Sequence, residues 1–347
     1  MNSIYGLTFE KLNDYILSCG YKSFRTKQIW KWLYKDLISD FSLMTDVKKE
    51  MIEKISADFI LLNLKISEKE VSNDNNTIKY LFELNDGNLI ETVLMKQSYG
   101  YSICVTTQVG CNMGCKFCAS GILKKRRNLD TSEIVSQVIL ASIDLGIRIS
   151  SLVVMGIGEP FDNYDNVIDF LSIINDPQGL CIGARHITVS TCGIIPKINE
   201  FAKLGIQYNL AISLHAATNE KRDLLMPINK ALKLNDLIDC IKKYIELTNR
   251  RVTIEYILID KVNDTLSDAK ELTKLLKGLN VLVNLIPYNP VSELNYKRSL
   301  LENRKIFYKT LCDNKIVATL RREFGSDISA ACGQLRSQNI TNKDNKA

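Results

Sequence analysis

From about residue 100 onward, the chain alternates short apolar segments of strand length with segments whose apolar residues recur at helical spacing. This alternation constrains the fold more than any other feature of the sequence. Parallel strands need a crossover connection that is usually a helix, so the pattern predicts an α/β protein with a mostly parallel sheet. Closed barrels and open doubly wound sheets both fit it. The expected strands are 102–106, 151–155, 186–190, 208–214, 251–258, 281–286 and 316–320.

The segment before residue 60 is predicted to be helical, because its apolar residues recur at helical spacing. Within it, residues 21–32 mix Lys and Arg with aromatic residues. This mixture is typical of a solvated basic face around a small helical core. It is equally typical of a surface on which aromatic rings stack on RNA bases while cations meet phosphates.

Residues 63–97 change character and indicate strands. The apolar runs 78–84 and 89–95 flank Asn85-Asp86-Gly87-Asn88, which is a strong signal for a β-hairpin. We therefore divide the chain into four parts. They are an N-terminal helical, RNA-contacting domain at 1–60, a β-hairpin extension at 61–98, a core domain at 99–336 and a flexible tail at 337–347.

The composition is that of an ordinary globular protein and excludes fibrous or fully disordered chains. No apolar run reaches the length of a membrane span, and charged residues stand where a signal peptide needs apolar ones. We therefore expect a cytoplasmic protein without a membrane segment. The 45 Lys and Arg exceed the 39 Asp and Glu, and the net charge of +6 favours a polyanionic partner only weakly.

The cysteines are the first sign of chemistry, since the chain has ten of them and only two histidines. In a reducing compartment, cysteines are more often metal ligands or catalysts than disulfides. Cys111, Cys115 and Cys118 form a CxxxCxxC motif just after a predicted strand. Three thiolates suit a [4Fe-4S] cluster with one iron left open, whereas zinc sites usually use CxxC pairs and a fourth ligand. Buried structural cysteines are the remaining alternative.

This cysteine spacing resembles that of the radical S-adenosylmethionine (SAM) enzymes. The resemblance implies a partial (β/α)6 barrel in which SAM chelates the open iron and one electron splits it into methionine and a 5′-deoxyadenosyl radical. It also implies that Gly158 and Glu159, after the strand at 151–155, contact the SAM ammonium group. A dinucleotide-binding loop is rejected there because Phe161 replaces the third glycine. The other residues assigned to the SAM pocket, all at or just past predicted strand ends, are Ser190, Ser213, Leu214, His215 and Asn289.

A second pair of cysteines narrows the family. Cys104 lies in the strand that leads to the three-cysteine motif, and Cys332 lies in a loop of small residues near the C-terminus. With Gly-Glu-Pro, Ser-Leu-His, Asn-Leu-Ile-Pro-Tyr-Asn-Pro and Ala-Ala-Cys-Gly-Gln-Leu in this order, residues 5–336 closely resemble the RlmN family of RNA adenine C2-methyltransferases.

The resemblance implies a mechanism in which Cys332 is methylated first by one SAM. A second SAM generates a radical that removes a hydrogen from the S-methyl group, and the resulting methylene radical adds to adenine C2. Cys104 then attacks Cys332, which releases methylated RNA and leaves a transient disulfide. Glu91 matches the residue that accepts the C2 proton.

The implied substrates are an adenosine in the peptidyl-transferase centre of 23S rRNA and the adenosine next to the anticodon of certain tRNAs. The implied cofactors are one [4Fe-4S] cluster and two SAM per turnover, with an electron donor such as flavodoxin or ferredoxin. We expect a monomer. The basic run Lys124-Lys125-Arg126-Arg127 and the pair Arg321-Arg322 are predicted to flank the entrance for RNA.

Three alternatives remain at the level of the sequence. The nearest is the sister Cfr type, which methylates C8 of the same rRNA adenine with similar cysteines. A radical SAM enzyme acting on a small metabolite would leave Cys104 and Cys332 structural. An iron-sulfur electron carrier is disfavoured, because carriers complete the cluster with four protein ligands.

Overall fold

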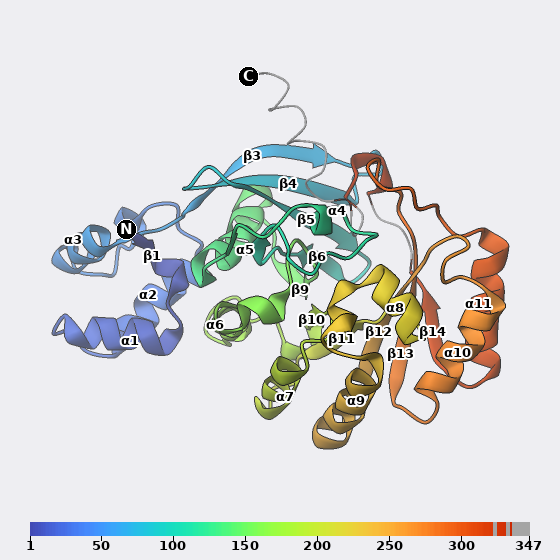
Figure 1. Ribbon diagram of the computed structural model, residues 1–347. Helices are drawn as coiled ribbons and strands as arrows, with labels where there is room; N and C mark the ends of the chain where they lie inside the picture. Colours follow the sequence, from blue (N-terminus) through green and yellow to red (C-terminus); the bar gives the residue numbers. More distant parts are fainter. Residues whose placement is uncertain (322–324, 331–333, 335–347) are drawn as a thin grey trace.

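The computed structural model describes residues 1–321, 325–330 and 334. Its centre is a ten-stranded sheet in the order β14-β13-β12-β11-β10-β9-β6-β5-β4-β3. Figure 1 shows this sheet as a curved arc with α6, α7, α9, α10 and α11 along its outer side. The arc confirms the α/β fold with a mostly parallel sheet that the alternation predicts, and it agrees with the partial barrel that the resemblance implies.

Seven neighbouring strands of the sheet run parallel to one another, from β6 at one side to β14 at the other. Each expected strand is present, within two residues of its predicted ends. The strands are β6 (Gly100–Cys104), β9 (Ile149–Val154), β10 (Ile187–Thr191), β11 (Asn209–Ser213), β12 (Val252–Leu258), β13 (Val281–Pro287) and β14 (Val317–Leu320).

Helices connect these strands and cover the sheet. The first of them, α5 (Thr131–Leu145), begins with a capping box in which Asp130 and Glu133 exchange side-chain to backbone hydrogen bonds. The others are α6 (Tyr164–Asn175), α7 (Ile195–Lys203), α8 (Asn219–Leu225), α9 (Leu234–Thr248), α10 (Leu266–Leu276) and α11 (Leu301–Asp313). Between β6 and α5 the chain also forms β7 (Gln108–Val109), α4 (Ala119–Ile122) and β8 (Arg127–Asn128).

The predicted hairpin is present, but it is not a separate unit. Its strands, β4 (Thr77–Leu84) and β5 (Leu89–Gln97), pair in antiparallel fashion, and β3 (Leu64–Val71) adds to β4. Because β5 also pairs with β6, with Val93 opposite Cys104, the extension continues the main sheet.

The N-terminal helices α1 (Phe9–Ser18), α2 (Phe24–Tyr34) and α3 (Lys49–Asp58) lie at the left of Figure 1. Of these, α1 and α2 contact α6 and its C-terminal end, and α3 lies farther out in Figure 1. Two-residue strands, β1 (Asn2–Ser3) and β2 (Phe59–Ile60), pair the two ends of this segment. Trp30 Nε1 donates to Asp176 Oδ1 at 3.1 Å. In the mixed basic and aromatic stretch, Trp30 is therefore a core residue, while Phe24 is about half exposed.

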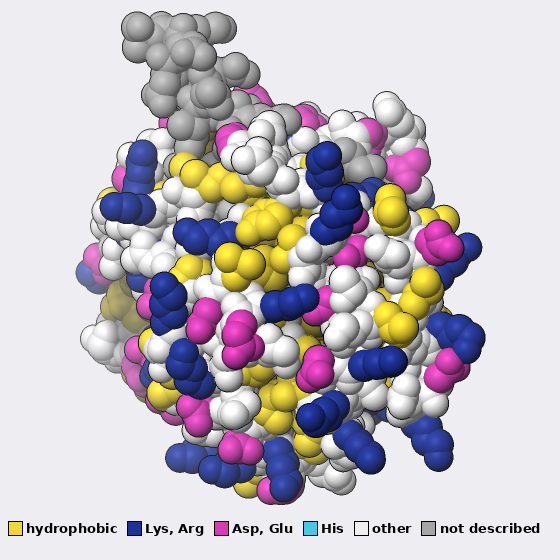
Figure 2. All heavy atoms as spheres, turned by 45° about the vertical axis from the view of Figure 1, so that its right-hand side comes forward, with side chains coloured by type: hydrophobic (Ala, Val, Ile, Leu, Met, Phe, Trp, Pro, Cys, Tyr) yellow, Lys and Arg dark blue, Asp and Glu magenta, His cyan; other side chains and the backbone are white. Residues whose placement is uncertain are grey.

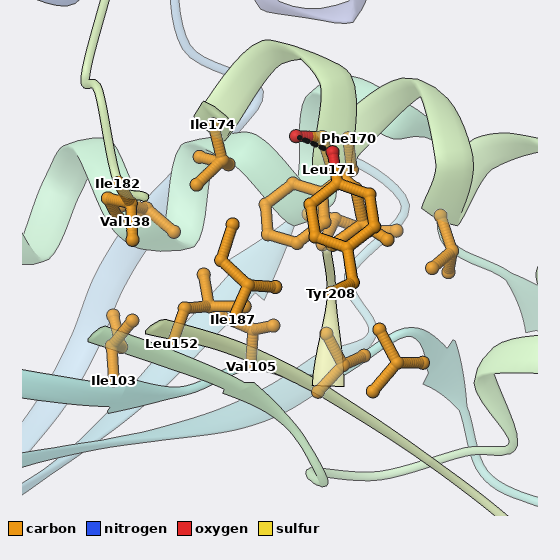
Figure 3. Packing of buried hydrophobic residues seen from close by; sticks show 14 of the residues in the cluster. Ile103, Val105, Val138, Leu152, Phe170, Leu171, Ile174, Ile182, Ile187 and Tyr208 are labelled. Carbon is orange, nitrogen blue, oxygen red and sulfur yellow. Dashed lines mark hydrogen bonds between the residues drawn. The ribbon is translucent and has the colours of Figure 1, made fainter. Parts of the chain in front are cut away.

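The largest hydrophobic core lies between the sheet and these helices. Figure 3 shows Ile103, Leu152 and Ile187 of the sheet facing Val138 of α5 and Phe170 of α6. Tyr208 closes this cluster and donates a hydrogen bond to the Leu171 carbonyl at 3.1 Å. No helix in the described ranges is long and apolar enough to cross a membrane. The domain boundaries at 60/61, 98/99 and 336/337 stay predictions, and the tail at 337–347 lies outside the described residues.

We expect Phe170→Ala to lower the free energy of unfolding by about 3–5 kcal/mol, because it removes a fully buried ring and leaves a cavity. Leu247→Ala on the exposed side of α9 is the matched control and should change stability by about 0.5 kcal/mol or less. Denaturant unfolding of both variants measures the difference. Similar losses in the two variants would contradict this location of the core.

Candidate active site

The main pocket lies where the parallel strands end. In such sheets the carboxyl ends of all strands meet at one edge, and the segments that follow them converge there. Loops after β7, β9, β10 and β11 contribute to this pocket. Residues near the carboxyl ends of β12 and β13 also line it. Its principal lining residues are Cys111, Met113, Cys115, Phe117, Cys118, Met155, Gly158, Glu159, Ser190, Thr191, Cys192, Ser213, His215, Met226, Glu255, Ile257, Ile286 and Arg321.

The three-cysteine loop between β7 and α4 brings Cys111, Cys115 and Cys118 to the same pocket. Backbone hydrogen bonds close the loop, with Cys118 N donating to the Cys115 carbonyl at 3.2 Å. Gly121 is required where the loop turns back, because a Cβ there would lie 2.6 Å from the Cys115 carbonyl oxygen. The sequence prediction that these cysteines act together is therefore supported by their placement.

The donor set fits an iron-sulfur cluster. Burial raises the pKa of Cys111 to about 11 and that of Cys115 further, so binding to iron must displace the thiol protons. In the described part of the chain, no three His, Cys, Asp or Glu residues are grouped to hold a single metal ion. Three cysteines that line one pocket are the ligand set of a [4Fe-4S] cluster with one open iron.

Glu159 connects the loop after β9 to the loop after β10. Its Oε1 accepts from Phe161 N at 3.0 Å and its Oε2 accepts from Cys192 N at 2.8 Å. Burial raises the pKa of Glu159, although these backbone hydrogen bonds oppose the shift. The preceding Gly158 has φ +109, and a Cβ there would meet the Gln108 side chain at 2.7 Å. Glycine is therefore needed to place the carboxyl group at the pocket wall.

His215 lies on the opposite wall with a defined tautomer. Its Nδ1 accepts a hydrogen bond from Ile257 N at 3.1 Å, so the ring proton is on Nε2. Burial lowers the pKa of His215 to about 3, and the imidazole is neutral at physiological pH. Its ring meets Phe117 edge to face, with the centroids 4.9 Å apart.

Ser190 and Ser213, at the ends of β10 and β11, also line the pocket, with their hydroxyl oxygens 3.4 Å apart. Leu214 and Asn289 are buried near it but do not line it. The role predicted for each residue in binding SAM stays a prediction.

Cys104 and Glu91 lie beside the pocket. Cys104 ends β6 and packs with Val93, Ile157 and Ala330 in a small cluster that Met155 joins to the pocket. Glu91 on β5 is buried rather than exposed, although a hairpin residue of this type is normally solvated.

Cys332 lies outside the described residues, but Ala330, two positions earlier, packs in the cluster of Cys104. No disulfide joins two cysteines within the described ranges. The disulfide expected between Cys104 and Cys332 therefore has no support in this structure.

Sequence reasoning missed Glu255 of β12, which also lines the pocket. It is buried, burial raises its pKa, and its Oε2 accepts from Asn284 Nδ2 at 2.8 Å. An acidic residue inside an otherwise apolar strand was the available signal, since burial of an unpaired carboxylate is costly. Sequence reasoning also missed Arg222, because it lies in the polar segment of α8, where an arginine is ordinary.

Two residues of the basic run at 124–127, Lys125 and Arg127, form ion pairs within the protein. The prediction that this run flanks the entrance for RNA stays a prediction. Lys125 Nζ lies 2.7 Å from Asp162 Oδ2. Arg127 binds both oxygens of Glu133 at 2.7 and 2.8 Å, and its Nε donates to Asp86 Oδ2 at 2.6 Å. Arg127 therefore attaches the hairpin turn to the start of α5. Lys124 and Arg126 are the exposed members.

We expect Arg127→Ala to lower the free energy of unfolding by about 1.5–3 kcal/mol, because the buried Glu133 carboxylate loses a two-pronged, charged partner. Arg126→Ala should change it by about 0.5 kcal/mol or less, since Arg126 is exposed. Thermal and denaturant unfolding test this. Equal stability of the two variants would contradict the structural role of Arg127.

Comparison with known proteins supports this geometry. Residues 105–276 match the model of the radical SAM superfamily, and residues 2–61 match that of the ribosomal RNA large subunit methyltransferase N-terminal domain. A solved radical SAM methyltransferase from Sphaerobacter thermophilus is 40% identical, with a TM-score of 0.93 over 97% of this chain and 100% of that one.

Two curated relatives are similar over nearly their whole length, and each is named "Probable dual-specificity RNA methyltransferase RlmN". The one from Acholeplasma laidlawii is 59% identical over 97% of this chain and 99% of its own length. The one from Spiroplasma citri is 55% identical over 98% of both chains. With the radical SAM fold and the three-cysteine loop in place, this similarity shows that the chain belongs to the RlmN family of radical SAM RNA methyltransferases.

Proposed function

We propose that this enzyme methylates C2 of an adenosine in the peptidyl-transferase centre of 23S rRNA and of the adenosine next to the anticodon in tRNAs. The observation that carries the proposal is the position of Cys104. It packs against Ala330, two residues before Cys332, and Met155 connects that cluster to the pocket of the three-cysteine loop. A radical SAM enzyme for a small metabolite would have no use for this arrangement.

Adenine C2 is an electron-poor aromatic carbon, so direct polar transfer of a methyl group from SAM is not feasible. One SAM therefore methylates the Cys332 sulfur. A [4Fe-4S] cluster held by Cys111, Cys115 and Cys118 would supply the electron for cleavage of a second SAM, and this chemistry would remove one hydrogen atom from the S-methyl group of Cys332. The methylene carbon then bonds to C2, which joins protein and RNA covalently.

Residues of this chain complete the reaction. Glu91, on the strand paired with that of Cys104, accepts the C2 proton. The unpaired electron of the adduct would return to the cluster when the C2 proton leaves. The Cys104 thiolate then attacks the Cys332 sulfur, and the electron pair of the broken sulfur–carbon bond stays on the methylene carbon. This carbon takes up a proton and becomes the methyl group of adenine, while a disulfide forms between the two cysteines. Each turnover consumes two SAM, and an external reductant such as flavodoxin or ferredoxin returns the disulfide to thiols and supplies the electron for SAM cleavage.

The pocket supports SAM binding through groups of defined charge. Glu159, held by two backbone amides, faces a cationic ammonium group, and the neutral His215 offers Nε2–H as a donor. Ser190, Ser213, Leu214 and Asn289 complete the proposed SAM site. Three thiolates from Cys111, Cys115 and Cys118 hold one [4Fe-4S] cluster and leave one iron for SAM.

RNA would reach this pocket with the target adenine unstacked, because a base in a helix hides C2 from a buried radical. On the face shown in Figure 2, basic side chains are scattered among acidic ones and hydrophobic side chains show in the middle. Binding of the RNA phosphates therefore depends on individual exposed cations such as Lys124 and Arg126, together with the N-terminal helical domain. We further infer that the enzyme acts as a monomer in the cytoplasm.

The C8-directed Cfr type is the nearest alternative. Identity of 53–59% to relatives named RlmN favours C2. Mass spectrometry of the modified adenosine distinguishes 2-methyladenosine from the 8-methyl isomer.

We expect the alanine variants of Cys104 and Cys332 to stop the reaction at different steps. Cys104→Ala still allows methylation of Cys332, radical formation and addition to C2, but it lacks the thiolate that breaks the link. It should accumulate a protein–RNA species that survives denaturant and maps to Cys332. Cys332→Ala should neither modify RNA nor attach to it. Denaturing gels after anaerobic incubation with SAM, reductant and RNA measure the protein–RNA adduct in both variants. If correctly folded Cys104→Ala forms no adduct, the mechanism is contradicted.

Removal of the two exposed cations of the basic run should weaken RNA binding. Replacement of both Lys124 and Arg126 by Gln is expected to reduce the slope of log K against log salt by about 1–2, because two phosphate contacts no longer release counterions. Lys242→Gln with Lys243→Gln on α9 makes the same charge change on another exposed surface and is the control. Filter binding across a salt series provides the slopes; the same slope in both double variants would exclude a role for this run.

A further inference from the structure

A buried cation lies behind the active-site pocket. Arg222 of α8 is 1% exposed and is among the largest fully buried side chains. Its guanidinium donates to the Cys192 carbonyl at 2.7 Å, to Asn229 Oδ1 at 2.9 Å and to the Leu214 carbonyl at 3.3 Å. All three acceptors are neutral, so the hydrogen bonds satisfy the donors without cancelling the charge.

No carboxylate among the described residues forms an ion pair with Arg222, whereas Lys221, its neighbour in the chain, lies 2.6 Å from Asp268. Burial lowers the pKa of Arg222, and the groups that oppose this shift are first the thiols of Cys192 and Cys115 and then Asp223. Proteins rarely bury a charge without a counter-charge, because desolvation is costly. The position of Arg222 therefore indicates an anion that it meets when the site is loaded.

The contacts of α8 point to that anion. Lys116 N, inside the three-cysteine loop, donates to the Leu225 carbonyl at the end of α8 at 2.9 Å. Leu225 and Met226 pack with Phe117, and Cys115 and Cys118 pack against the same cluster. Through these contacts α8, which carries Arg222, packs directly against the three-cysteine loop.

We propose that Arg222 is the counter-charge of the [4Fe-4S] cluster and raises its reduction potential. The inference rests on the proposed function, since it needs the cluster. A cluster in its 2+ state with three thiolates carries one net negative charge, and the electron that enters it adds a second. A fixed cation in a low-dielectric site stabilises the more negative state, and net charge around a cluster is one of the terms that set its potential.

A structural role would explain the same hydrogen bonds, because they join the segments after β10 and β11. A structural role depends on the hydrogen bonds of Arg222, whereas the proposed role depends on its charge, so variants that change one and not the other distinguish them. Arg222→Lys keeps the charge and loses most hydrogen bonds, whereas Arg222→Gln loses the charge and keeps part of the hydrogen bonding. Lys242→Gln, an exposed position on α9, removes one charge where water and salt screen it, and is the control.

A second variant neutralises the charge without touching the guanidinium. Asn229 Nδ2 donates to Asp223 Oδ1 at 2.7 Å, and Asn229 Oδ1 accepts from Arg222. Asn229→Asp combined with Asp223→Asn exchanges the amide and the carboxylate at nearly constant shape and net charge. This exchange variant places a carboxylate against Arg222 while the hydrogen bonds to Cys192 and Leu214 remain available.

The experiment is an anaerobic redox titration of the reconstituted full-length proteins with dithionite, followed by electron paramagnetic resonance. We expect Arg222→Gln and the exchange variant to bind wild-type iron, but to have a reduced-to-oxidised ratio at least about tenfold lower at a fixed potential, which is 59 mV for one electron. Arg222→Lys should change this ratio less, and Lys242→Gln should match the wild type.

Wild-type potentials in the exchange variant, with normal iron content, would overturn the inference and leave the proposed function intact. The inference is also overturned if Arg222→Lys lowers the ratio as much as Arg222→Gln. Should Arg222→Gln fail to assemble a cluster, the exchange variant alone decides. Failure of the wild-type protein to bind about four irons would instead contradict the proposed function.

Discussion

The active site depends on the parallel pairing of seven strands. Because β6 and β9–β14 run in one direction, the segments that follow them emerge at the same edge of the sheet. Residues far apart in sequence, such as Cys111, Glu159 and Glu255, thereby line one pocket. The register of the strands determines the depth at which each lining side chain lies in the pocket. In this register Val189 is paired with Val154, and Glu255 is paired with Asn284.

Buried polar groups then hold the loops at that edge. The Glu159 carboxyl joins the loop after β9 to that after β10, and the Arg222 guanidinium joins the latter to the segment after β11. Breaking such contacts would leave charged groups in the interior without partners, which is unfavourable enough to keep the loops in place. The pocket is therefore organised by its own charges, one anionic and one cationic, on either side of Cys192.

The antiparallel extension borders the same proposed site. It contributes Glu91 and pairs through Val93 with Cys104, and Arg127 connects its turn to Glu133 at the start of α5. Described residues before Cys332 also rest on it, since Lys79 Nζ donates to the Ile328 carbonyl at 2.9 Å. In this enzyme of the RlmN family, the extension thus contacts both the strand of Cys104 and the described residues 328–330.

Local pattern in the chain was enough to predict the parallel strands, the hairpin, the three-cysteine loop and the residues at strand ends, because each depends on periodicity or spacing within a short segment. Three features could be known only from the folded chain: the hairpin continues the main sheet, Glu91 is buried, and Arg127 pairs with Asp86 and Glu133. Tertiary structure also decided that Arg222 is buried behind the cysteines and forms no ion pair with a carboxylate of the described residues. These properties depend on partners distant in the chain, and local pattern carries no information about which distant groups will meet.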